Sequence, residues 1–325
     1  MMISALVPMA FSHFIFYKIA FFAAIIMLTK IHYDQCPCCG SVAIGHCFDC
    51  VDYTVSKEMY EVWKCSNCTF QFTQNVPDSL HIGPYYQSDA YVSHSDTKQG
   101  VINRLYHFAR TITLKTKLRL VQKSTQLKQG NLLDYGAGTG AFAHMATMAA
   151  WTVTGLEPDD TARQNALKTH GLSLEPSINL QQLPSASFDA ITLWHVLEHV
   201  HDLNTTIEQF QRILKFSGRL LIAVPNYTSF DAHYYQQFWG AYDVPRHLYH
   251  FSPKAMQVLM EQNGFTIEKK YPMWFDSLYV SMLSEKYKKG KNSYLSALWI
   301  GILSNLKTLF STDKCSSVIY VMKKK

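Results

Sequence analysis

The sequence predicts an α/β protein with a doubly wound, mainly parallel sheet, preceded by a small cysteine-rich module. Two observations carry this prediction. Short apolar runs alternate with amphipathic, capped segments after residue 130, and seven of the eight cysteines fall between Cys36 and Cys68. Strand–helix alternation is typical of sheets covered by helices on both faces. With 325 residues the chain is long enough for one large domain and a small one.

The alternation can be followed element by element. Apolar runs predict buried strands at 131–135, 151–157, 187–194, 219–225 and 316–322. Helical spacing with capping or glycine stops predicts helices at 101–126, 140–150, 159–171 and 252–265. Thr205 and Glu208 match a capping box, which predicts a further helix from Thr205 to Gly218.

A glycine-rich turn follows the first of these strands. DYGAGTGAF places Asp134 before Gly136, Gly138 and Gly140, and glycines allow backbone N–H groups to approach a ligand closely. The second strand ends at Glu157, where a carboxylate is well placed to hold two ribose hydroxyls. Ligands of doubly wound sheets bind at the carboxyl ends of the strands. We therefore expect a cofactor that contains adenosine.

Two cofactors fit this outline. Gly136-x-Gly138-x-x-Ala141 satisfies the permissive dinucleotide pattern, which would indicate a nicotinamide oxidoreductase. S-adenosylmethionine also contains adenosine but has no pyrophosphate. Asp134 favours the second cofactor, because a carboxylate beside the turn repels a pyrophosphate and attracts an ammonium or a sulfonium group. A tight turn without a ligand is the remaining alternative.

Several segments together resemble a known family. LLDYGAGTGAF, GLEP, FDAITLWHVLEHV and LKFSGRLLIAVPN are similar to the motifs of class I S-adenosylmethionine-dependent methyltransferases, in particular the group of the ubiquinone-pathway O-methyltransferases. The resemblance covers roughly residues 101–325 and implies a Rossmann-like, seven-stranded sheet with S-adenosylmethionine as cofactor. We also assign Trp194 to the cofactor site. Many relatives hold the adenine amine with an acid before the fourth strand, whereas here Asn179 or Gln181 would substitute for it.

His195-Val196-Leu197-Glu198-His199 matches H-x-x-E-H, the inverted zinc-protease pattern. A protease would need both histidines on one helical face, a third protein ligand and an open position on the metal. The next recognisable helix begins only near Thr205, which disfavours this alternative. In the family that the chain resembles, the motif lies in the loop after the strand and binds no metal. We expect His195 to border the methionine half of the cofactor, and Glu198 and His199 to hold the loop.

Residues 226–251 form a long aromatic segment that we expect to cover a small-molecule acceptor. Methyl transfer requires alignment of the reactants, and a general base when the acceptor carries a proton. In the sugar C-methyltransferases that the chain partly resembles, a histidine just before an F-S step helps to deprotonate the substrate. His247 matches that position best and His250 next. Arg246 is a candidate for binding an anionic group, and three tyrosines are candidates for closing the site: Tyr85, Tyr86 and Tyr91.

The cysteine spacing predicts a structural zinc ribbon. Cys36-x2-Cys39 and Cys65-x2-Cys68 supply four thiols for a tetrahedral site. The resemblance to sugar C-methyltransferases, which carry an N-terminal zinc-binding segment, implies the same. A third pair, Cys47-x2-Cys50, leaves another ligand set open, and Cys38 would be a spare thiol. Only two lysines lie between the first and the last of these cysteines, so we expect no nucleic-acid partner.

The predicted domains are a hydrophobic segment at 1–30, the zinc ribbon at 31–80 and a methyltransferase domain at 81–325, with 226–251 as an insertion. The first segment is apolar around Lys18 and is either a membrane anchor or a stretch upstream of a true start at Met27. We expect a cytoplasmic catalytic domain whose only membrane contact is through residues 1–30. The net charge of +6 comes mainly from C-terminal lysines, which we interpret as solvated surface.

The sequence thus predicts a methyltransferase that uses S-adenosylmethionine and a structural zinc ion and acts on oxygen or carbon of a small molecule. The alternative from another class is a scaffold protein with a degenerate methyltransferase fold. Binding of the cofactor separates the two.

Overall fold

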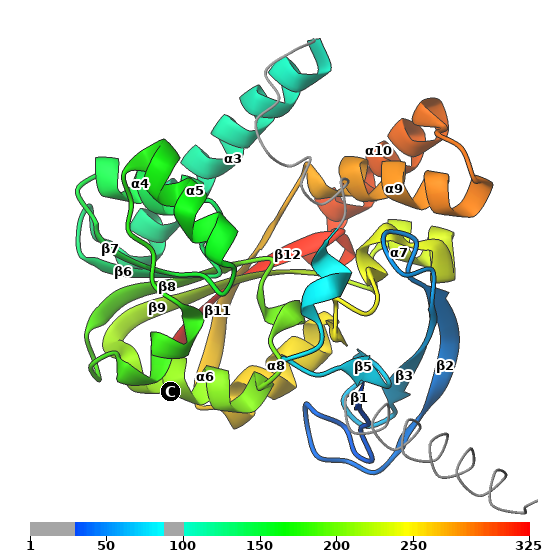
Figure 1. The fold of residues 1–325 in the computed structure, drawn as a ribbon, viewed down its shortest axis with the longest axis horizontal. Helices are drawn as coiled ribbons and strands as arrows, with labels where there is room; N and C mark the ends of the chain where they lie inside the picture. Colours follow the sequence, from blue (N-terminus) through cyan, green and yellow to red (C-terminus); the bar gives the residue numbers. More distant parts are fainter. Residues whose placement is uncertain (1–29, 88–100) are drawn as a thin grey trace, which may run out of the picture.

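The structure, a computed structural model, describes residues 30–87 and 101–325 (Figure 1). The hydrophobic segment predicted at the N-terminus lies outside these residues except for Lys30, and so does Tyr91. Among the described residues, no helix combines the length and the apolar character needed to cross a bilayer.

A six-stranded sheet forms the centre of the larger part, in the order β11-β12-β9-β8-β6-β7. Four strands are parallel: β6 (Asn131–Tyr135), β7 (Thr152–Leu156), β8 (Phe188–Trp194) and β9 (Leu214–Pro225). On the other side, β12 (Ser317–Lys324) runs antiparallel to β9, and β11 (Phe265–Pro272) antiparallel to β12. The predicted fold class is confirmed. The seventh strand is reduced to one parallel bridge between Leu156 and Glu175, and the chain then turns into a 3-10 helix at Ser177–Gln182.

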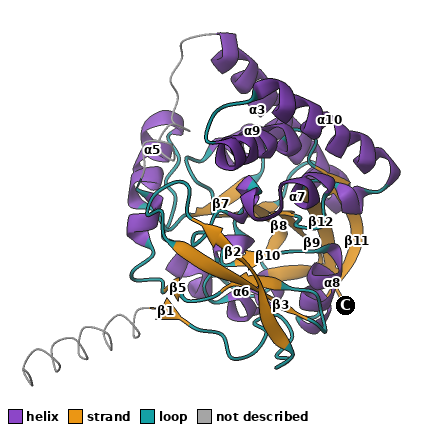
Figure 2. Cartoon of the chain, turned by 90° about the vertical axis from the view of Figure 1, so that its right-hand side faces the viewer, coloured by secondary structure: helices purple, strands orange, loops and turns teal. Residues whose placement is uncertain are grey.

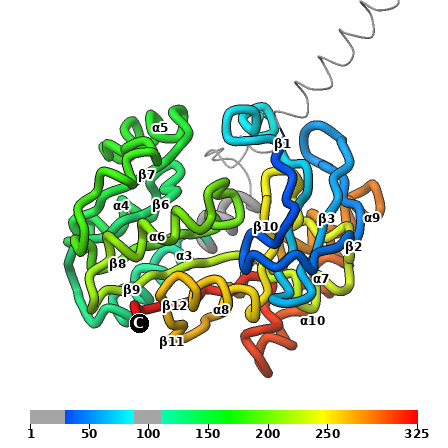
Figure 3. The backbone as a smooth tube through the Cα atoms, turned by 90° about the horizontal axis from the view of Figure 1, so that it is seen from below, coloured from blue at the N-terminus to red at the C-terminus, as the bar shows by residue number. Residues whose placement is uncertain are grey.

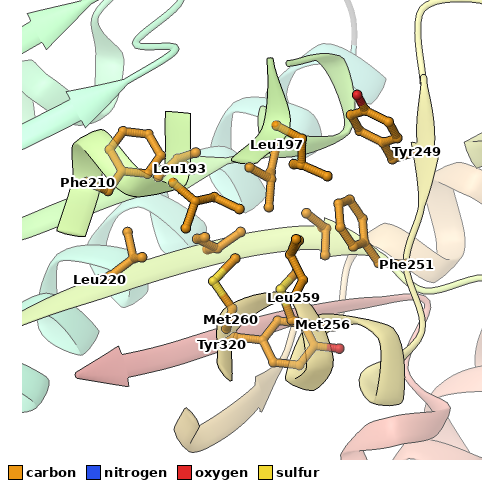
Figure 4. Packing of buried hydrophobic residues seen from close by; sticks show 14 of the residues in the cluster. Leu193, Leu197, Phe210, Leu220, Tyr249, Phe251, Met256, Leu259, Met260 and Tyr320 are labelled. Atoms are coloured by element: carbon orange, nitrogen blue, oxygen red, sulfur yellow. The ribbon is translucent and has the colours of Figure 1, made fainter. Parts of the chain in front are cut away.

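Alternate residues of the strands face two separate cores, as the pleat of a sheet requires. Leu132, Ala190 and Leu221 pack under α3 (Val101–Thr125) and α4 (Ala141–Met148). Their neighbours Leu133, Ile191 and Leu220 face α6 (Leu203–Ile213) and α8 (Pro253–Gln262) on the other side. Figure 4 shows this second core, where Phe210 of α6 and three side chains of α8 meet the sheet: Met256, Leu259 and Met260.

One predicted helix was wrong at both ends. The helix α6 begins at Leu203 with Asp202 before it, so Thr205 and Glu208 lie inside the helix and do not form the predicted capping box. The helix ends at Ile213, five residues before the predicted stop at Gly218. Leu214 instead pairs with Phe188 as the first residue of β9 and is fully buried. Strand pairing therefore overrides the helical spacing of the apolar residues at this point.

The cysteine module shares one sheet with the aromatic segment 226–251, which we call the substrate wall, or the wall. The antiparallel order of this sheet is β10-β4-β3-β2, with β2 (Ile44–Val51), β3 (Met59–Cys65), β4 (Gln71–Thr73) and β10 (Tyr249–His250). Beside it lies the short pair β1 (Lys30–Ile31) and β5 (Val76–Pro77). Figures 2 and 3 show the module packed against the chain around β10 and α7 (Phe230–Tyr235). Thr73 of β4 donates its N–H to the carbonyl of Leu248 and its hydroxyl to the carbonyl of His247.

A buried ion pair crosses the same contact. The guanidinium of Arg246 is fully buried and donates to Asp52 at 2.9 Å and to Asp243 at 2.6 Å. Burial alone would raise the pKa of Asp52, but hydrogen bonds from Arg246 and from backbone N–H groups lower it to about 2. Asp52 also accepts the N–H groups of the turn that joins β2 to β3, so one carboxylate orders the module and fixes the wall.

Candidate active site and cysteine cluster

The glycine turn after β6 has the backbone that the sequence predicts. Gly136, Gly138 and Gly140 have φ values of +72°, +54° and +77°, a region that side chains strain. A Cβ at Gly136 would lie 2.4 Å from Val196, so the turn packs on the loop after β8, whereas a Cβ at Gly138 would meet nothing within 4 Å. Glu157 accepts the N–H of Gly138 at 2.8 Å. A carboxylate and open space therefore meet at Gly138.

Asp134 lies beneath this turn and is almost completely buried. Its carboxylate accepts a hydrogen bond of 2.8 Å from the hydroxyl of Thr192 on β8. Burial raises the pKa of Asp134 to about 7, although the bond from Thr192 and the charge of Lys117 act in the opposite direction. A cationic ligand would favour the ionised form of such a carboxyl group.

Lys117 of α3 completes this part of the site, and the sequence reasoning missed it. Its Nζ lies 4.6 Å from the ring centroid of Trp194, and burial lowers its pKa to about 8. The only signal in the sequence was the basic character of residues 101–126, in which this lysine is one of several. What distinguishes Lys117 is its position opposite Asp134, which the helix packing sets.

Trp194 and Asn179 occupy different surroundings. Trp194 packs edge-on against Phe142 with centroids 5.2 Å apart, and its buried indole N–H has no hydrogen-bond partner within the described chain. Asn179 lies on a 3-10 helix (Ser177–Gln182) and donates to Glu175 at 3.0 Å. An unpartnered donor, two buried carboxylates and the open space at Gly138 fit a polar, cationic ligand such as S-adenosylmethionine.

His195 follows β8 directly and has a φ of +60°, an unusual backbone for a histidine that often accompanies functional sites. Its Nε2 lies 2.9 Å from Asp276, the first residue of α9 (Asp276–Lys289), and its Nδ1 lies 3.4 Å from Glu198. Burial would lower the pKa of His195, but the two carboxylates raise it to about 10. His195 is therefore an imidazolium at neutral pH and holds a positive charge rather than accepting a proton.

The ring of His247 is oriented by a backbone carbonyl. Its Nδ1 lies 2.8 Å from the carbonyl of Ala241, which can only accept, so Nδ1 carries the proton and Nε2 keeps a lone pair. His199 is arranged in the same way, with Nδ1 3.0 Å from the carbonyl of Arg246. The two rings meet edge-on, with centroids 4.6 Å apart. Burial, followed by the proximity of the His247 ring, lowers the pKa of His199 to about 4, so the His199 ring is neutral at pH 7.

Glu198 lies between these histidines. Its carboxylate is fully buried, and neither oxygen has a hydrogen-bond partner among the described residues. One donor atom each from Glu198, His199 and His247 lies within 4.8 Å of the others, an arrangement that could hold a metal ion. His195 is not part of this group, and Leu197–His199 is a 3-10 turn rather than an α-helix. The motif thus does not present its two histidines as the pair of ligands that a protease needs.

The structure separates the other wall residues by role. His250 is buried in β10 with Nε2 3.1 Å from the hydroxyl of Thr73, and burial lowers its pKa. Arg246 is committed to Asp52 and Asp243, which leaves the expected anion-binding role without support. Tyr86 reaches the site, because its hydroxyl lies 3.0 Å from Nδ1 of His199. Tyr85 points elsewhere and donates to Glu58.

The four predicted zinc ligands lie together. One sulfur each from Cys36, Cys39, Cys65 and Cys68 falls within 4.8 Å of the others. The Cys36–Cys68 and Cys39–Cys65 sulfurs are 3.6 and 3.7 Å apart, much longer than a disulfide and close to the roughly 3.8 Å expected when four sulfurs surround zinc at about 2.3 Å. Cys47 is exposed, and Cys50 donates to the carbonyl of Gln237, so the third pair stands apart.

Both knuckles of this cluster have the same backbone. The N–H of Gly40 bonds to the carbonyl of Cys36, and the N–H of Thr69 to that of Cys65. Gly40 and Thr69 both have positive φ, at +69° and +66°. The second knuckle also contacts the larger part of the chain, through a 2.8 Å bond between the hydroxyls of Thr69 and Ser252. The cluster is thereby fixed to the N-terminus of α8.

Comparison with known proteins supplies the family. Residues 105–270, about half of the chain, match the family described as methyltransferase domain. The chain belongs to this family. The resemblance seen in the sequence is thereby confirmed.

Individual relatives are distant. A probable S-adenosylmethionine-dependent methyltransferase of Mycobacterium tuberculosis is 29% identical over 108 residues, covering 31% of this chain and 38% of that protein. A ubiquinone biosynthesis O-methyltransferase of Actinobacillus pleuropneumoniae is 34% identical over 134 residues, covering 37% of this chain and 57% of that protein. The chain thus spans less than two thirds of either relative. A solved structure of magnesium protoporphyrin IX methyltransferase from Synechocystis is 13% identical with a TM-score of 0.48, covering 74% of this chain and 97% of that one.

The charge of His195 can be measured directly. We expect its ring resonance in a full-length sample to stay that of an imidazolium from pH 6 to pH 8, since its pKa is raised to about 10. Asp276→Asn removes the carboxylate that raises the pKa of His195 most. The pKa of His195 should then move toward the ordinary value of about 6.5. NMR titration of the histidine resonances checks this, with His233→Gln to help assignment. A wild-type His195 that titrates near pH 6.5 would contradict the ion pair.

Proposed function

We propose that the chain is an S-adenosylmethionine-dependent methyltransferase that acts on a small molecule. The observation that carries this proposal is the pairing of two buried carboxylates, Asp134 and Glu157, around the open space at Gly138. A nicotinamide dinucleotide would bring its pyrophosphate against the same carboxylates, with Lys117 near Asp134 and Arg163 near Glu157 to offset part of the repulsion. Family membership supports the same choice.

The residues have distinct tasks in holding the cofactor. Glu157 is placed to exchange its bond from Gly138 for the two ribose hydroxyls. Asp134 attracts the amino group and the sulfonium, and Lys117 pairs with the carboxylate of the methionine half. Trp194 covers that half, and Asn179 is the candidate for the adenine amine. When bound, the cofactor supplies an electrophilic methyl group.

His247 is our candidate for the general base. Its Nδ1–H is fixed to the carbonyl of Ala241, so Nε2 can take a proton from an acceptor O–H or an acidic C–H group. The protonated His195, beside Asp276 and Glu198, keeps positive charge near the methionine half and cannot serve as that base. Tyr86 and His199 line the same side and help to exclude water. His250, whose ring bonds to Thr73, is the second candidate.

We further propose that the four-cysteine cluster binds one structural zinc ion. The sulfur separations and the two matching knuckles support it. Zinc would be held by Cys36, Cys39, Cys65 and Cys68 and would contribute folding free energy to the module. Because β4 of this module pairs with β10, the metal would also steady the wall that carries His247.

Titration of S-adenosylmethionine into the full chain tests the function. We expect micromolar binding that Glu157→Gln weakens by about tenfold to a hundredfold, the loss of one or two hydrogen bonds to a charged group. Glu208→Gln, a change to an exposed glutamate of α6, is the matched control and should bind as the wild type does. Absence of binding to folded wild-type protein would favour the scaffold alternative.

Transfer of a labelled methyl group tests the base. With an acceptor found by screening, we expect His247→Gln to lower kcat by about a hundredfold or more while the affinity for S-adenosylmethionine is kept. His250→Gln is the comparison. Full turnover in the first variant together with loss in the second would move the role to His250.

Metal analysis tests the zinc site. We expect one zinc per purified chain, and its loss in Cys65→Ser together with a lower unfolding temperature. Cys47→Ser, a change to an exposed cysteine of the same module, should keep the metal. A variant pair that loses zinc equally would instead point to a ligand set that includes Cys47.

A further inference from the structure

The helix α10 (Tyr294–Phe310) exposes apolar side chains along its whole length. Leu295 is 84% exposed, Trp299 61% and Phe310 88%. We define the α10 apolar face as the eight exposed large apolar residues of this helix: Tyr294, Leu295, Leu298, Trp299, Ile302, Leu306, Leu309 and Phe310. At 100° per residue they fall within one arc of about 160°, on the side opposite the buried residues.

The orientation of α10 is fixed by Ser304 on its other face and by Asn305 near one edge of the apolar arc. Ser304 donates to the buried carboxylate of Asp231 at 2.7 Å, and Asn305 donates to the carbonyl of Trp274 at 2.9 Å. A Cβ at Gly301 would lie 2.7 Å from Leu278 of α9, which shows how closely the two helices pack. Rotating α10 to hide its leucines would break these contacts. The apolar face is therefore directed outward by the fold.

Exposed lysines gather at one end of this face. Between Asp276 and Phe310 the chain has five lysines and two acids. Of the two acids, Glu285 is buried and paired with Lys289, and Asp276 is paired with His195. Four of the lysines lie at the turn between α9 and α10, and all four are exposed: Lys286, Lys288, Lys289 and Lys291. The turn between α9 and α10 thus carries positive charge where the α10 apolar face begins.

A bilayer surface with anionic lipids matches this combination better than another protein does. The face is convex and continuous along the helix rather than a groove, and it includes Trp299 and Tyr294, residue types that favour the boundary between headgroups and acyl chains. At 17 residues α10 is shorter than the roughly 20 needed to span a bilayer, so it would lie in the interface plane. Figure 1 shows α9 and α10 side by side at one end of the molecule, away from α4 and α5 (Asp160–His170).

We propose that the α10 apolar face, together with the lysines of the α9–α10 turn, docks the protein on an anionic lipid bilayer. This contact is additional to any made by residues 1–30, where the sequence alone places membrane contact. It does not rest on the proposed function. The docked helices would also lie next to the candidate active site, because α9 begins at Asp276, whose carboxylate bonds His195.

Vesicle flotation of the full-length protein tests the proposal, with phosphatidylcholine vesicles that contain about 30% phosphatidylglycerol and with pure phosphatidylcholine. We expect binding to the anionic vesicles, weakened at least tenfold by the combined change Leu295→Ser, Trp299→Ser, Phe310→Ser. The matched control removes three exposed apolar residues elsewhere, Leu80→Ser, Met148→Ser and Phe216→Ser, and should bind as the wild type does. Lys286→Gln with Lys291→Gln should reduce the preference for anionic vesicles.

Other occupants of the face give different results. If a second copy covers it, the wild type sediments as a dimer, does not float, and the α10 variant is a monomer. If residues 1–29 cover it, the wild type fails to float and a chain that starts at Met27 floats. If residues 1–29 alone bind the membrane, the α10 variant floats like the wild type. Each of these three results overturns the proposal. Circular dichroism of the variants, and titration of S-adenosylmethionine, show independently that the fold is kept.

Discussion

The buried ion pair between Arg246 and Asp52 is the interaction on which the arrangement of the candidate site depends. A guanidinium taken out of water is costly unless carboxylates surround it, and Asp52 and Asp243 do so from two distant parts of the sequence. Asp52 closes the β2–β3 turn of the cysteine module, and Asp243 belongs to the wall. The module and the wall are therefore one structural unit, although 194 residues separate Asp52 from Arg246.

The backbone of the wall also holds two histidines of the candidate site. The carbonyls of Arg246 and Ala241 each accept an Nδ1–H, which fixes the orientation of the His199 and His247 rings beside Glu198. His195, on the other side of Glu198, is charged because it lies between two carboxylates. A base and a cation thus stand within one cluster. Their difference comes from their neighbours, a backbone carbonyl for His247 and two carboxylates for His195, not from residue type.

The sequence predicts the local features of this protein well and the long-range ones poorly. The glycine turn with Asp134 and the four-cysteine cluster follow from short spacings that only a few geometries satisfy. The structure has the turn after β6 and, separately, the four sulfurs close to one another in the module. Lys117 and the burial of Arg246 depend on partners far along the chain, which no spacing reveals. Leu214 fits a helical face equally well, and only its pairing with Phe188 assigns it to a strand. The outward direction of α10 likewise depends on Asp231, which lies 73 residues before Ser304.

The most direct test of this account is hydrogen–deuterium exchange in Asp52→Asn compared with the wild type. Loss of the buried charge should speed exchange at residues 243–250, including the Leu248 amide that bonds to Glu198, and at the Thr73 amide that bonds to Leu248. The strands β6 to β9 should stay protected. Asp49→Asn, a change to an exposed acid of β2, should leave exchange in both regions as in the wild type. Faster exchange confined to the turn at residues 52–58 would show that the wall keeps its order without the ion pair, and would contradict the account.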